Sequence, residues 1–135
     1  MLFCSFLTPS RAAARPGSVE EHPDPVAVVV ARLLDEEANL LVAEGELATK
    51  IRKGDRVSVA EAKVAVAEAK VAVAEAKLRV AEAKLRVAEG ELEQARQSGD
   101  QAAVAKQEAA VAKQEVAVAE AKVAVAEAKV AVAEA

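Results

Sequence analysis

Few side chains in this sequence are placed to do chemistry together. His22 is the only histidine and lies in the proline-bounded segment EEHPDP, and Cys4 is the only cysteine. Cys4 has no histidine close in sequence that could activate it, and a lone histidine in a linker is far more often solvated than a base or a ligand. We therefore expect no catalytic, cofactor-binding or metal-binding residues.

The glutamates are regularly spaced instead of clustered. The unit VAVAEAK occurs in full at 64–70, 71–77, 116–122 and 123–129, so Glu and Lys recur every seven residues. Carboxylates in a line along a helix do not form the close pair that acid–base catalysis uses. The spacing predicts a structural protein and not an enzyme.

The composition favours long helices. Of the 135 residues, 53% are hydrophobic and 30% are charged, and the only aromatic residues are Phe3 and Phe6. A mixture of Ala, Val, Glu and Lys is typical of coiled coils and not of disordered chains. The net charge of −4 argues against a nucleic-acid partner, because phosphate binding requires a basic surface.

The odd length of the repeat decides between strand and helix. In a strand the two faces would exchange at every seven-residue repeat, so Val57 and Val64 would point to opposite sides. A helix returns each repeat to nearly the same face. Because no proline follows Pro25, long uninterrupted helices are expected beyond it.

The repeat can be assigned to positions a to g of a coiled-coil heptad. Apolar residues occupy a and d, Glu61 and its equivalents occupy e, and Lys63 and its equivalents occupy g. Charges that flank an apolar contact in this way are typical of coiled coils. The predicted helix-packing residues are Val57, Val64, Val71, Leu78, Leu85, Leu92, Val116, Val123 and Val130 at a, and Ala60, Ala67, Ala74, Ala81, Ala88, Ala105, Ala112, Ala119 and Ala126 at d.

A second apolar column runs along the same helices. Val59, Val66 and Val73 begin a line at position c, and Ala residues lie beside it at position f. Position c lies about 200° around the helix from position a, so a single partner helix leaves it in water. We therefore expect the helices to have neighbours on two sides, as in a bundle or a layered array.

Two related segments predict where the helices end. VAEGELATKIRKGD at 42–55 and VAEGELEQARQSGD at 87–100 both finish in Gly-Asp. Gly favours the position after a helix end, and Asp favours the N-cap of the next helix. The predicted turn residues are Gly54, Asp55, Gly99 and Asp100.

The N-terminal boundary follows from Asp24 and Pro25, an N-cap followed by a first-turn proline. The predicted helices then run over about 25–52, 56–97 and 101–135. The middle helix would be roughly 60 Å long.

The heptad register predicts antiparallel hairpins. If a faces d across the second turn, Leu92 lies opposite Ala105, and the centre of the pairing falls between Ser98 and Gly99, where the turn is expected. Leu85 with Ala112 and Ala81 with Val116 belong to the same register.

The charges near this turn agree in part with the hairpin. Glu89 would attract Lys106, whereas Glu91 would repel Glu108. Parallel association between chains, and a single long helix that tolerates its glycines, stay open as alternatives.

Residues 1–24 are predicted to form a disordered tail. The segment 1–19 contains Arg11 and Arg15 and no acidic residue, so it also fits a transit peptide. Both interpretations stay open, and no compartment is assigned.

The expected fold class is all-α: long heptad-repeat helices of an Ala/Val-rich coiled coil, two or three of them folded as antiparallel hairpins. The helical repeat region covers 25–135. The expected function is a structural coiled-coil module, a rod, spacer or oligomerisation element, whose partner is another copy or another coiled coil.

Two alternatives to this function stay open. An amphipathic protein that binds a membrane surface or another interface has less support, because no aromatic anchor lies in the helices. The near-identical heptads also fit a repeat fragment of a larger protein.

Overall fold

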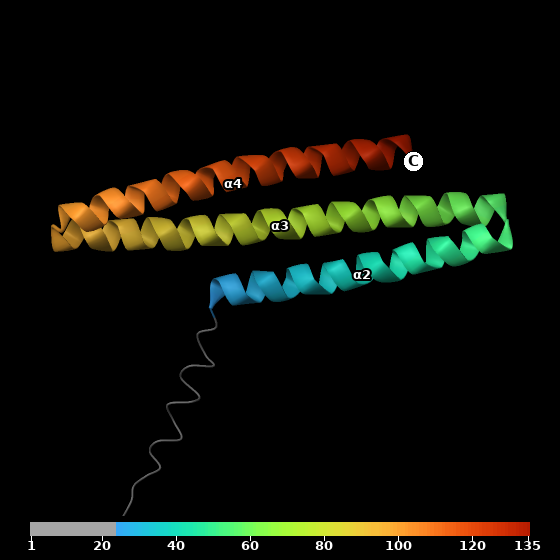
Figure 1. Ribbon diagram of the computed structural model, residues 1–135, viewed down its shortest axis with the longest axis horizontal. Helices are drawn as coiled ribbons and strands as arrows, with labels where there is room; N and C mark the ends of the chain where they lie inside the picture. Colours follow the sequence, from blue (N-terminus) through green and yellow to red (C-terminus); the bar gives the residue numbers. More distant parts are fainter. Residues whose placement is uncertain (1–23) are drawn as a thin grey trace, which may run out of the picture.

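The computed structural model describes residues 24–135, and within this range the regular structure is entirely helical (Figure 1). Helix α2 spans Pro25–Lys53, α3 spans Arg56–Ser98 and α4 spans Gln101–Glu134. Each helix begins at the predicted residue, and its end differs from the predicted one by a single residue. The predicted transit peptide, and residues 1–23 of the predicted tail, lie outside the described range.

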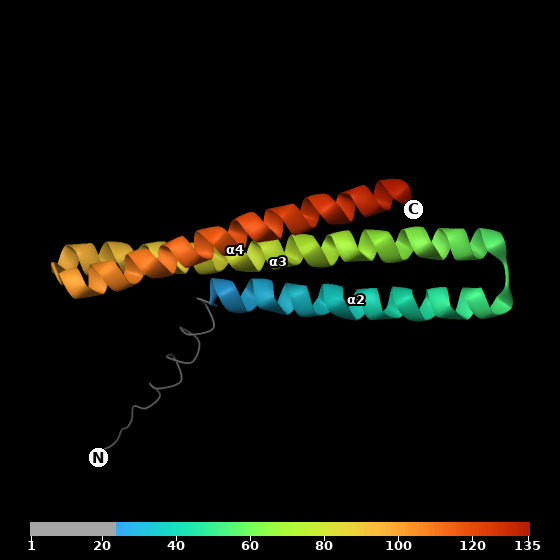
Figure 2. The same ribbon diagram turned by 45° about the horizontal axis from the view of Figure 1, so that its top comes forward.

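The three helices form one open layer with α3 in the middle. Each outer helix packs against α3 and runs antiparallel to it (Figures 1 and 2). Helices α2 and α4 do not pack against each other, so the layer does not close into a bundle. Helix α2 has 29 residues and α3 has 43, so the end of α3 nearest the second turn is covered by α4 alone.

The burial pattern makes α3 the centre of the fold. Ten residues of α3 are buried, against two of α4 and none of α2. Every buried side chain among the described residues is Ala, Val or Leu, and the least exposed is Ala76, at 1%. Small side chains let the helix backbones approach closely, but each contributes little apolar area to the core.

The first turn is built from the predicted Gly-Asp pair. Gly54 adopts φ 76°, and its N–H donates to the carbonyls of Lys50 and Ile51. Asp55 then caps α3, because its carboxylate accepts from the N–H of Val57 at 3.1 Å. A left-handed glycine followed by an aspartate N-cap satisfies backbone groups that both helix ends would otherwise leave unpaired.

The second turn repeats this chemistry. Gly99 adopts φ 76° and donates to the carbonyls of Ala95 and Arg96. Asp100 accepts from the N–H of Ala103 at 3.2 Å. The two turns therefore reverse the chain in the same way, which follows from the similarity of the two segments.

Replacing Gly99 by Ala should destabilise the protein by about 1 kcal/mol, because a Cβ is strained at a positive φ. Gly90 provides the matched control, since it lies inside α3 with nothing within 4 Å of an added Cβ. Gly90→Ala should therefore stabilise by about 0.5–1 kcal/mol. Urea unfolding followed by circular dichroism measures both changes, and equal effects at the two positions would contradict this account of the turn.

The cap at Asp55 should make stability depend on acid. The Ser58 hydroxyl donates to the carboxylate at 2.7 Å and, together with the N–H groups of Ser58 and Val57, lowers the pKa of Asp55 below its ordinary value of 3.8. A carboxyl group with a lowered folded pKa stabilises fully above the unfolded pKa, and this stabilisation is lost as pH falls through the folded pKa.

Ser58→Ala should therefore reduce the loss of stability below about pH 4, and Asp55→Asn should remove the contribution of this group. The measurement is the urea midpoint at a series of pH values. Identical pH profiles for the wild type and both variants would show that the cap carries no pH dependence.

Candidate protein interface

No converging set of reactive side chains emerges in residues 24–135. This range contains no group of three or more His, Cys, Asp or Glu that could hold a metal ion. None of its helices is both long and apolar enough to span a bilayer. His22 and Cys4 lie outside the described residues.

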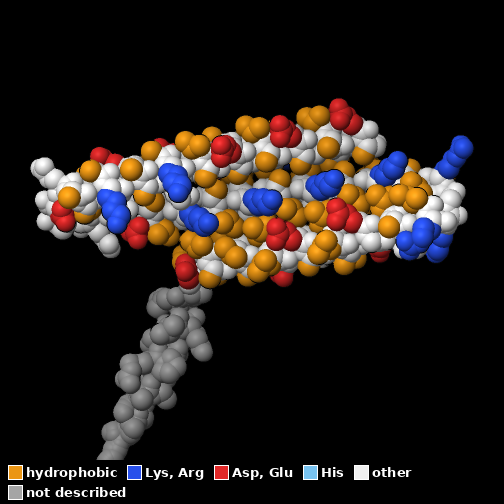
Figure 3. Space-filling model, viewed as in Figure 1, with side chains coloured by type: hydrophobic (Ala, Val, Ile, Leu, Met, Phe, Trp, Pro, Cys, Tyr) orange, Lys and Arg blue, Asp and Glu red, His pale blue; other side chains and the backbone are white. Residues whose placement is uncertain are grey.

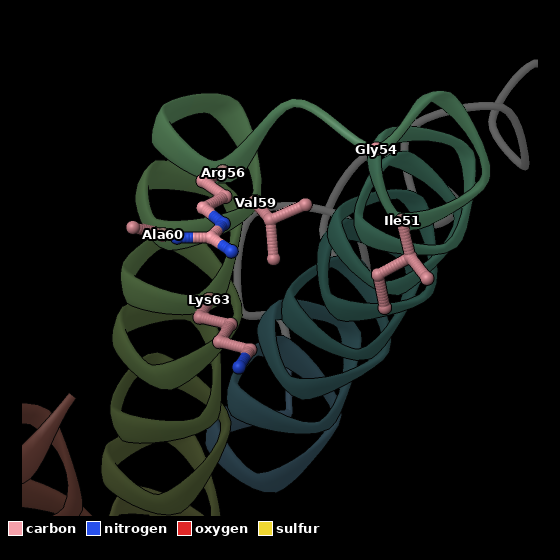
Figure 4. A pocket seen from close by; sticks show the side chains of 6 residues that line it. All are labelled: Ile51, Gly54, Arg56, Val59, Ala60 and Lys63. Atoms are coloured by element: carbon pink, nitrogen blue, oxygen red, sulfur yellow. The ribbon is translucent and has the colours of Figure 1, made fainter.

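A surface depression of 390 Å³ lies beside the first turn (Figure 4). Ile51 of α2 lies on one side, and the Val59 and Lys63 side chains of α3 extend into the gap between the two helices. A depression of 430 Å³ beside the second turn is lined by Arg96, Gly99, Gln101, Val104, Ala105 and Glu108.

The lining residues of the two depressions occupy equivalent positions in the two turn segments, 45 residues apart. Their chemistry differs, because Ile51 corresponds to Arg96 and Lys63 corresponds to Glu108. The two depressions occupy equivalent places because the two turns have the same geometry. Their different side chains give no sign of a common ligand.

The two helix contacts of the layer follow one rule. In α2 the half-buried positions Leu33, Leu40 and Leu47 correspond to the a positions of α3. They meet the c and f positions of α3, where Ala76 and Ala83 are buried. Val87, the next c residue beyond the reach of α2, is 43% exposed.

The contact between α3 and α4 repeats the rule. Beyond the reach of α2, the buried residues of α3 are Ala88, Leu92 and Ala95 at positions a and d. On α4 the buried residues are Val118 and Val125, at position c. Each helix therefore turns its a/d stripe, the apolar line at positions a and d, toward the c and f positions of the next helix.

This rule places the predicted packing residues of α3 in two groups. Most of them are buried or half-buried, and the two that follow the first turn are exposed. Ala67, Ala74, Ala81, Ala88 and Leu92 are buried, Val64, Val71, Leu78 and Leu85 are half-buried, and Val57 and Ala60 are exposed.

The predicted pairing of the α4 stripe with α3 is corrected by the structure. Ala105, Ala112, Val116, Ala119, Val123, Ala126 and Val130 are all exposed. The predicted pairs Leu92 with Ala105, Leu85 with Ala112 and Ala81 with Val116 are therefore not the contacts of this hairpin. The second apolar column is evident in the sequence of α3, but the equivalent residues of α4 were not predicted to form the contact. Those residues are Val104, Val111, Val118, Val125 and Val132.

The physical reason lies in the first two heptads of α4. Position c carries Val104 and Val111 there, whereas the a and d positions carry only alanines. Each additional buried CH₂ group is worth about 0.8 kcal/mol, so the valine column next to the turn makes the better contact with α3.

The ion pairs agree with this orientation of α4, in which position c and not the a/d stripe faces α3. Arg96 lies 3.6 Å from Glu108, and Glu75 lies 3.9 Å from Lys129. The expected attraction between Glu89 and Lys106 is not among the ion pairs of residues 24–135. Exposed pairs of this kind contribute only about 0.2–1 kcal/mol each, so they follow the packing and do not set it.

This orientation of α4 leaves its whole a/d stripe without a partner among residues 24–135. Val116, Val123 and Val130 are 58%, 57% and 56% exposed. Charged residues line both edges of the stripe, at positions e and g, and they are exposed as well. Figure 3 shows hydrophobic side chains at the surface along the outer helices. A continuous apolar line between charged edges is a surface suited to another helix.

Gln107 makes an unfavourable contribution to the contact between α4 and α3. Its side chain lies at position f, and its Oε1 is buried without a hydrogen-bond partner. Gln107→Leu should therefore stabilise the protein by about 1 kcal/mol. Gln101→Leu is the control, because Gln101 is exposed and its replacement should change stability by less than about 0.5 kcal/mol. A destabilised Gln107→Leu variant would contradict this placement of α4.

Comparison of the chain with protein families, curated proteins and solved structures gives no match. The unpartnered stripe of α4, identified from the geometry of residues 24–135, is therefore the leading candidate interface.

Proposed function

We propose that this chain is a structural coiled-coil module, which acts as a rod, spacer or oligomerisation element by binding other helices. The observation that carries the proposal is the exposed a/d stripe of α4 with its charged edges. Apolar surface of this extent is costly in water, so a helical protein partner would stabilise it.

The layer also has a second free face, on α2. Leu34 and Leu41 of this helix are 60% and 69% exposed. A layer with an apolar surface on each outer helix supports a role in assembly, because both outer helices can gain further neighbours.

Catalysis and membrane binding have less support. The described carboxylates lie in rows along the helices, and a row does not provide a general acid–base pair. The helices contain no Trp, Tyr or Phe to anchor them among lipid headgroups.

The proposal predicts that Val123→Glu weakens self-association or binding to a partner helix without unfolding the chain. Val123 is exposed in the middle of the stripe, so a charge there should change the stability of the monomer by less than about 0.5 kcal/mol. Ala124→Glu is the matched control, because Ala124 is also exposed but lies outside the stripe.

Sedimentation velocity at about 1–100 μM, with circular dichroism on the same samples, makes the comparison for self-association. A monomer at every concentration that also fails to bind other coiled-coil helices would refute the proposal. Binding to lipid vesicles with a rise in helicity would favour the membrane alternative instead.

A further inference from the structure

We propose that the partner of the α4 stripe is the same stripe of a second copy, and that the two α4 helices run antiparallel around a two-fold axis. This inference rests on the proposed function and names the partner and its orientation. It follows from the order of charges along α4, of which only Glu108 and Lys129 form ion pairs with α3 within residues 24–135.

The charged edges of α4 reverse halfway along the helix. In the first half, Lys106 and Lys113 occupy e, whereas Glu120 and Glu127 occupy e in the second half. Position g shows the opposite order, with Glu108 and Glu115 followed by Lys122 and Lys129. Each charge in one half of α4 therefore has an opposite charge at the matching position of the other half, with the centre between Ala117 and Val118.

An antiparallel pair with this centre brings opposite charges together along both edges. Antiparallel helices set e against e and g against g. Lys113 then meets Glu120 of the second copy, and Lys106 meets Glu127. On the other edge, Glu115 meets Lys122 and Glu108 meets Lys129. All four pairs attract, and the two-fold axis repeats each of them.

Neighbouring registers and the parallel arrangement fit less well. A shift by one heptad sets Glu120 against its own copy, or Lys113 against its own copy. A parallel pair sets Glu115 against Glu120 of the second copy. The central antiparallel register alone combines the longest overlap with no repulsive pair along either edge.

The apolar layers agree with the same register. Val116 lies opposite Ala119 of the second copy, Val123 opposite Ala112, and Val130 opposite Ala105. Each of these layers sets one large side chain against one small one, and the intervening layer sets Ala109 against Ala126. A parallel pair would alternate Val–Val with Ala–Ala layers.

The exposed face of α2 is a poorer partner for this stripe. Its c column contains Asp35 between Val28 and Val42, so an acidic group would face apolar side chains. A contact between α4 and α2 of another copy is also heterologous, and such contacts form rings or open filaments. The contact between two α4 helices is isologous and closes as a dimer.

Charge exchange tests the arrangement. One variant carries Lys106→Glu and Lys113→Glu, and the other carries Glu120→Lys and Glu127→Lys. All four residues are exposed, and the observed ion pairs of α4 involve other residues. Each variant alone places like charges along the e edge, so its dimer should dissociate roughly tenfold more readily or worse. In a 1:1 mixture every e pair attracts again, so the mixed dimer should recover the affinity of the wild type.

Cross-linking fixes the orientation. In a Cys4→Ser background, chains with Ala105→Cys and chains with Val130→Cys should form disulfide-linked dimers only when mixed. A dimer linked through Val130→Cys alone would show a parallel pair and overturn this inference, while leaving the proposed function in place. Species larger than a dimer, or a dimer indifferent to the charge variants, would overturn it in the same way. A wild type that stays monomeric would overturn it too, and the proposed function would fall as well if no other helix bound.

Discussion

Helices α3 and α4 each carry two apolar columns about 200° apart around the helix axis, and one neighbouring helix can cover only one of them. Helix α3 meets this constraint with a neighbour on each side, which is why nearly all buried residues belong to it. Helices α2 and α4 each have one neighbour, so each leaves an apolar face in water. The open layer and its exposed stripes follow from this single constraint.

The two Gly-Asp turns make the layer possible. Gly54 and Gly99 both adopt φ 76°, and an aspartate caps the helix that follows each of them. Because both turns reverse the chain in the same way, the same rule of contact applies twice: the a/d stripe of one helix meets the c and f positions of the next. Among residues 24–135 no helix packs on the a/d stripe of α4, so this stripe is exposed.

The order of charges on α4 determines which orientation of a second helix on this free stripe brings opposite charges together. Along α3 the e position carries Glu in five successive heptads, from Glu61 to Glu89, whereas along α4 it changes from Lys to Glu at mid-length. Contact with α3 uses only part of this order: Glu108 pairs with Arg96 and Lys129 with Glu75, whereas the charged e residues of α4 form no ion pair within residues 24–135. In the proposed pair of α4 helices, this reversal brings opposite charges together at every charged e and g position within the overlap. The buried contact with α3 and the proposed association therefore use different apolar columns of α4, and Glu108 and Lys129 at the g edge border both contacts.

The sequence alone determined the helices and the residues that end them, because heptad spacing and Gly-Asp chemistry act over only a few residues. It also named the a/d residues of α4, but it paired them with α3 and did not name the c column of α4. Only the tertiary structure decided which column of α4 meets α3. The two columns are nearly equal in apolar character, and the choice depends on how Val104 and Val111 pack beside the second turn. Such a difference of a few methyl groups becomes decisive only when two helices are held side by side in three dimensions.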